Sequence, residues 1–139
     1  MAALSSITAV RPTANTTLAS RGPVLYGSTN SAGQAAYFDV ADSKYKLADS
    51  NASSAIAAAV GVFVTPGVDA GYGYVATGGS VILVGTTMVV GTVYCVGATA
   101  GSIVPISDLT TGDYVTILGT ASTATQLDLA IKASGIVKP

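Results

Sequence analysis

The clearest hydrophobic pattern in the chain lies near its C-terminal end. Apolar side chains at Leu127, Leu129 and Ile131 alternate there with Gln126, Asp128, Ala130 and Lys132. Successive side chains of a strand point to opposite faces of a sheet, so this alternation is typical of a strand with one buried face. The pattern therefore predicts a strand over residues 126–132.

Short apolar runs rich in Val, Ile and Tyr occupy much of the chain after residue 23. They cover residues 24–26, 36–40, 45–48, 60–64, 72–76, 81–84, 88–90, 93–96, 103–106 and 114–118. Segments rich in Gly, Ser, Thr, Asn, Asp and Pro separate these runs, as turns separate strands. We expect an all-β fold: a small antiparallel β-barrel or sandwich of about ten short strands with one short helical turn and an extended N-terminal arm.

Two local signals refine this expectation. Residues 49–51 are able to cap a helical turn over residues 52–58, where the alanine density favours helix; a continuous strand into residues 60–64 is the alternative. Two glycines within Thr77–Ser80 stand between apolar runs, and glycine adopts positive φ readily. The second signal predicts a hairpin that joins residues 72–76 to 81–84.

Residues 1–23 are polar and small and keep no strand or helix period. We expect an N-terminal arm over residues 1–23 and a single β domain over residues 24–139. The arm is either a frayed terminus or an extended segment that becomes ordered on a neighbouring subunit. No basic region followed by an apolar stretch is present at the start, so we expect no signal peptide and a mature chain that begins near Met1.

A long uncharged stretch raises the alternative of a membrane segment. Between Asp69 and Asp108 there are 38 residues without a charged side chain, and the mean hydropathy is +0.59. Glycines interrupt every apolar run in this stretch, whereas a spanning helix needs about 20 mostly apolar residues. The pattern favours short strands.

The composition excludes most catalytic chemistry. Charged residues make up 9% of the chain, there is no His, Glu or Trp, and 14 Ser and 17 Thr supply much of the polar surface. Imidazole-based triads, zinc sites with His ligands and Glu-based acid–base pairs are therefore absent. We expect no enzyme activity, no catalytic, cofactor-binding or metal-binding residues, and no cofactor.

The few charged and reactive groups have ordinary structural explanations. Asp39, Asp42 and Asp49 flank two lysines, which fits local charge balance better than a calcium loop. Cys95 lies in an apolar run, so we expect a buried small hydrophobic residue. A net charge of −1 with scattered basic residues gives no basis for nucleic-acid binding. A β protein with so few charges has poorly protected strand edges and tends to associate, which suggests an assembly component.

Several segments resemble a known class of virion protein. They are Gly78–Gly85, Val89–Tyr94, Ala98–Pro105, Asp108–Gly119 and Gln126–Gly135. Together they are similar to the C-terminal half of capsid decoration (cement) proteins of tailed bacteriophages, and the similarity covers roughly residues 45–137.

The resemblance implies a non-enzymatic protein on the outer surface of an icosahedral shell. Such a protein bridges neighbouring major capsid protein subunits and strengthens the shell, and it is usually a homotrimer, with dimers also known. The expected location is the outer capsid surface of the virion, after synthesis in the cytoplasm of a bacterial host, with no nucleic-acid or membrane partner. The arm is then the expected contact, with Arg11, Pro12 and Arg21 as candidate capsid-contact residues.

The alternative function is a receptor- or glycan-binding β module of a phage fibre or surface protein. That function needs a cluster of exposed aromatic side chains. Tyr26, Tyr37, Tyr72, Tyr74 and Tyr94 are the residues whose exposure decides between the two.

Overall fold

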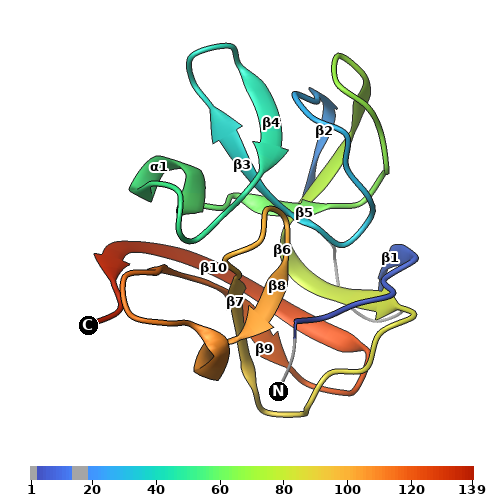
Figure 1. The fold of residues 1–139 in the computed structure, drawn as a ribbon. Helices are drawn as coiled ribbons and strands as arrows, with labels where there is room; N and C mark the ends of the chain where they lie inside the picture. The colour runs from blue at the N-terminus through green and yellow to red at the C-terminus, as the bar shows by residue number, and fades with distance from the viewer. Residues whose placement is uncertain (1–2, 14–18) are drawn as a thin grey trace.

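The computed structural model describes residues 3–13 and 19–139, and within them the chain is almost entirely β-structure (Figure 1). The ten strands are β1 (Ala9–Pro12), β2 (Ala19–Leu25), β3 (Ala35–Asp39), β4 (Lys44–Leu47), β5 (Gly61–Phe63), β6 (Tyr72–Val84), β7 (Val93–Val96), β8 (Ile103–Pro105), β9 (Tyr114–Ala121) and β10 (Gln126–Val137). A helical turn, α1 (Ser54–Ala57), and a 3₁₀ turn, η1 (Ile106–Asp108), complete the elements. The predicted all-β class is confirmed.

All ten strands belong to one curled, antiparallel sheet. Its order is β4-β3-β5-β6-β10-β9-β7-β8, and β1 and β2 also pair with β6. Strand β6 has neighbours on both edges along its length: β2 and β5 flank its first half, and β1 and β10 flank its second half. Figure 1 shows β2, β3 and β4 on one side of the molecule and β7, β8, β9 and β10 on the other.

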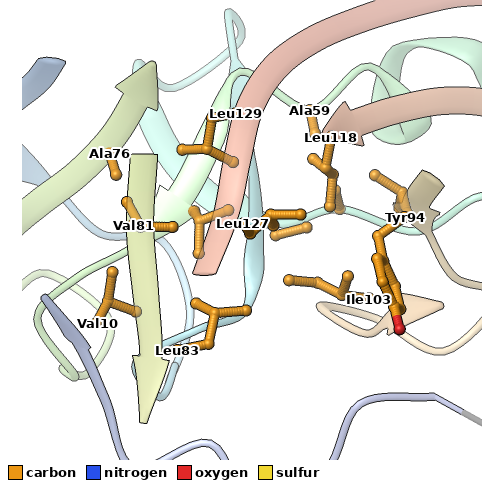
Figure 2. Close-up of a cluster of buried hydrophobic side chains, with 14 of the residues drawn as sticks. Val10, Ala59, Ala76, Val81, Leu83, Tyr94, Ile103, Leu118, Leu127 and Leu129 are labelled. Carbon is orange, nitrogen blue, oxygen red and sulfur yellow. The ribbon is translucent and has the colours of Figure 1, made fainter. Parts of the chain in front are cut away.

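The main core lies between these two parts of the sheet. It contains Val10, Val81, Leu83 and Leu127, which point toward one another in Figure 2 together with side chains from β7, β8 and β9. Alternate positions of the same strands supply two smaller clusters on the opposite faces. One comprises Val24, Tyr26, Ala36, Tyr45, Phe63 and Val75, and the other Cys95, Val104 and Leu109. In many strands, residues on both faces are therefore buried, and alternate residues pack into different clusters.

The predicted hairpin at Gly78 and Gly79 is wrong, because β6 runs straight through both residues. The glycines instead follow directly after a β-bulge at Thr77, where the register between β2 and β6 shifts from Ser20↔Ala76 to Ala19↔Gly78. Ala76 faces the main core before them and Val81 faces it after them, which shifts the alternation by one residue. Gly79 has φ 79°, a conformation that glycine adopts without strain. A glycine pair fits a hairpin or a bulge, and partners on both edges keep this segment extended.

Two further local predictions need correction, one in its length and one entirely. The helical turn is present but shorter than expected, and Ser53 caps it by accepting a hydrogen bond from the Ile56 amide at 3.2 Å. The predicted strand at 88–90 is wrong, because that segment is irregular and its Met88 side chain fills the main core. The C-terminal alternation is confirmed, and β10 extends to Val137.

The described part of residues 1–23 is paired with the same chain. Strands β1 and β2 lie against β6, Val10 is buried in the main core, and the boundary expected at residue 23 falls inside β2. Whether this segment also orders on a neighbouring subunit stays a prediction. The described residues include no helix with the length and apolar character needed to cross a membrane.

The bulge gives a matched pair of glycine substitutions. Gly79→Ala places a side chain at positive φ and should lower the free energy of unfolding by about 1–2 kcal/mol. Gly78→Ala should change it much less, because its Cβ would meet only the Ala19 Cβ at an ordinary 3.6 Å. Urea unfolding of both variants measures the difference, and equal losses of stability would contradict a requirement for positive φ at Gly79.

Candidate binding surface

The structure places all three predicted contact residues on the surface along one edge of β6. Arg11 and Pro12 end β1 opposite Ile82 and Val81, and Arg21 lies in β2 opposite Val75. The two arginines are on opposite sides of the glycine bulge, on the order of 20 Å apart by the rise of a strand. The structure therefore exposes these residues on one margin of the sheet and does not join them into a single site.

Arg21 lies in a groove that the sequence did not indicate. The groove has a volume of about 500 Å³ and is lined by Ser20, Arg21, Phe38, Tyr45, Val60 and Thr77. One guanidinium nitrogen of Arg21 donates a hydrogen bond to the Tyr45 hydroxyl at 3.2 Å, and this bond raises the pKa of Arg21 above its ordinary value. The groove thus joins a cation to two aromatic side chains from β3 and β4.

The curling of the sheet brings these strands together. Tyr26, which follows β2, forms a parallel bridge with Tyr45 of β4, so strands far apart in the sheet order meet. The groove lies beside the cluster of Tyr26, Phe63 and their neighbours, because Tyr45 belongs to both. Buried side chains therefore support one wall of the groove.

Tyr26 is the centre of that supporting cluster. Its ring packs edge-on against Phe63 with centroids 5.0 Å apart, and its hydroxyl donates to the Thr65 carbonyl at 2.7 Å. Two glycines leave room for the ring, since a Cβ on Gly73 would come within 2.0 Å of the Tyr26 oxygen and one on Gly67 within 2.6 Å of its ring. Larger residues at either glycine would displace the ring.

Ion pairs occupy the lysines of the β3–β4 hairpin. Lys46 contacts Asp39 at 2.7 Å and Asp42 at 2.9 Å, and Lys44 contacts Asp69 at 3.3 Å. The expected charge balance between these lysines and Asp39 and Asp42 is confirmed. In the part of the chain that the structure describes, Arg11 and Arg21 have no carboxylate within ion-pair distance. The two arginines are thus available to anionic groups outside the chain.

The tyrosines divide between core and surface. Tyr26, Tyr37 and Tyr94 are buried, while Tyr72 is 68% exposed and Tyr74 is 47% exposed. Three of the five tyrosines proposed for glycan contact are therefore inside the protein. The glycan-binding alternative loses its main support and retains only the pair on β6.

The other reactive side chains contribute to the structure of the protein. Cys95 is fully buried as expected, and burial raises the pKa of its thiol to about 11. Asp113 accepts a hydrogen bond from the Thr110 amide at 2.9 Å within the turn before β9. No group of three potential metal ligands occurs among residues 3–13 and 19–139.

Comparisons of the chain with family models, curated proteins and solved structures gave no match. The fold and the exposed residues therefore carry the functional argument.

Tyr26→Phe should lower the free energy of unfolding by about 1 kcal/mol at pH 7, because the hydrogen bond to Thr65 is lost. Burial raises the pKa of Tyr26, so above pH 10 the unfolded chain ionises first and the wild type loses stability as pH rises. The difference in free energy of unfolding between wild type and variant should therefore narrow above pH 10. Urea unfolding at pH 7 and pH 10.5 measures it, and a constant gap would contradict a raised pKa.

The Asp39 carboxyl should titrate below its ordinary range, because its hydrogen bond from Lys46 lowers its pKa. The stabilisation is present above the pKa of the unfolded chain, about 3.9, and is lost as pH falls through the lower folded value. Carbon-detected NMR titration should show Lys46→Met raising the Asp39 pKa. Lys44→Met, which removes the pair with Asp69, should leave it unchanged; equal effects of both variants would refute the assignment to Lys46.

Proposed function

We propose that this protein is a structural virion protein that decorates the outer surface of a phage capsid and stabilises it by bridging major capsid protein subunits. The observation that carries the proposal is the margin formed by β1 and β2. Its expected contact residues, Arg11, Pro12 and Arg21, are exposed, and neither arginine is paired with a carboxylate in the described chain. Such a margin suits attachment to a protein surface that offers acidic groups.

Two further properties support attachment to a protein lattice. Among the described residues, β1 pairs with β6 alone, and attachment of a partner strand to its other edge would fit this arrangement. Charged residues are few, so the surface offers little electrostatic repulsion against close packing. The resemblance of several segments between residues 45 and 137 to phage decoration proteins points to the same class. We include in the proposal that the protein is non-enzymatic and acts as a homotrimer, with a dimer as the alternative.

A glycan-binding module is the second candidate. The observation in its favour is the exposed pair Tyr72 and Tyr74, two residues apart on β6. Aromatic rings on one strand face are able to stack on sugar rings. Because Tyr26, Tyr37 and Tyr94 lie in the core, fewer observations support glycan binding than support capsid decoration.

Point substitutions test the proposal better than deletion of the arm. Removal of residues 2–23 would take away β1, most of β2 and the buried Val10, so both the fold and the contact would change. Single changes of exposed arginines leave the core intact.

Arg11→Gln and Arg21→Gln should each weaken binding to cognate capsids that lack this protein by about threefold or more, since each removes a cation facing the shell. Co-sedimentation over a range of protein concentrations measures this. Lys132→Gln makes the same charge change at an exposed position of β10 and should leave capsid binding unchanged. Light scattering should give three times the 13.6 kDa chain mass for every variant. Unchanged capsid occupancy in both arginine variants would refute the proposed contact.

A further inference from the structure

We propose that the groove between β2 and the β3–β4 hairpin binds an acidic side chain of a partner protein, seated with its carboxylate on Arg21 and its aliphatic part against Phe38. This inference rests on the proposed function for the identity of the partner as a capsid protein. The binding chemistry of the groove itself follows from its lining residues and from the charges around it.

The polar wall of the groove presents hydrogen-bond donors. The Arg21 guanidinium carries five N–H groups, and one of its nitrogens donates a hydrogen bond to the Tyr45 hydroxyl. Because Tyr45 accepts that bond, its own hydroxyl proton is free to point into the groove. A wall of donors around a cation selects an anionic acceptor, and a carboxylate matches the guanidinium in shape.

Part of the groove's lining forms an apolar wall. Phe38 is 38% exposed and Val60 is 40% exposed, and both line the groove. The Phe38 ring packs against the Tyr45 ring with centroids 5.0 Å apart, so the apolar wall directly adjoins the donors. An occupant that buries this wall carries methylene groups next to its carboxylate. Asp and Glu side chains, with the aliphatic residues beside them, have this chemistry.

The groove is held in shape before a ligand arrives. Tyr45 is 5% exposed and belongs to the buried cluster with Tyr26 and Phe63, so its ring position is fixed by packing. Its hydroxyl in turn holds the Arg21 side chain, which otherwise would move freely on the surface. Less conformational entropy is lost when a ligand binds to side chains that are already ordered.

Charge complementarity favours a partner as the source of the carboxylate. The nearby carboxylates of the chain, Asp39, Asp42 and Asp69, contact Lys44 and Lys46. Within the described residues, none forms an ion pair with Arg21. A volume of about 500 Å³ accommodates one side chain with part of its flanking backbone. An acidic residue on a capsid loop therefore fits the groove in both charge and size.

Hexanoate is a direct probe, because it carries one carboxylate on an aliphatic chain. In an NMR titration of the full chain, hexanoate should shift the resonances of Arg21, Phe38 and Tyr45 saturably, and hexanol should bind at least fivefold more weakly. Arg21→Gln should weaken hexanoate binding at least fivefold without changing hexanol binding. Arg21→Lys, which keeps the charge and loses the planar fork, should give an intermediate affinity. Lys132→Gln, which removes a cation from an exposed position of β10, is the matched control and should bind hexanoate like the wild type.

The absence of saturable shifts in the groove, or equal affinity for hexanoate and hexanol, would overturn the proposal. Capsid binding by a protein that does not bind hexanoate would refute the groove and leave the decoration function standing. Hexanoate binding by a protein that ignores capsids would support the groove's chemistry and refute the proposed function.

Discussion

The pairing of β6 on both edges is the constraint on which the rest of the molecule depends. Four strands share this one partner, and the bulge at Thr77, directly before Gly78 and Gly79, shifts the inward-facing positions of β6 by one residue. Without the bulge, Val81 and Leu83 would face away from the main core, because a shift of one residue moves every side chain to the opposite face. The same bulge separates the stretch that carries Arg11 from the stretch that carries Arg21.

A buried aromatic cluster connects this framework to the surface. Tyr26 bridges to Tyr45 at the meeting of β2 and β4, and Gly73 leaves the space that its ring requires. Tyr45 then holds the Arg21 guanidinium at the edge of the groove. Packing inside the curled sheet thus determines the position of a cation outside it, and the proposed function uses a surface that the core orders.

Regular alternation made part of this structure predictable. The C-terminal strand follows directly from its period of two, and the all-β class follows from short β-branched runs between turn formers. The glycine pair in β6 could not be resolved, because it suits a hairpin and a bulge equally and long-range pairing decides between them. The groove could not be predicted from the sequence. Phe38 and Tyr45 are cross-strand partners in the β3–β4 hairpin, but only the curling of the sheet brings Arg21 of β2 beside them.

Electron cryo-microscopy of cognate capsids incubated with this protein would show whether and how it attaches to the shell. We expect added density on the outer surface that contacts more than one major capsid protein subunit, with the β1–β2 margin and its Arg11 and Arg21 facing the shell. Shells without added density, or density attached through Tyr72 and Tyr74 with the β1–β2 margin turned to solvent, would contradict this expectation.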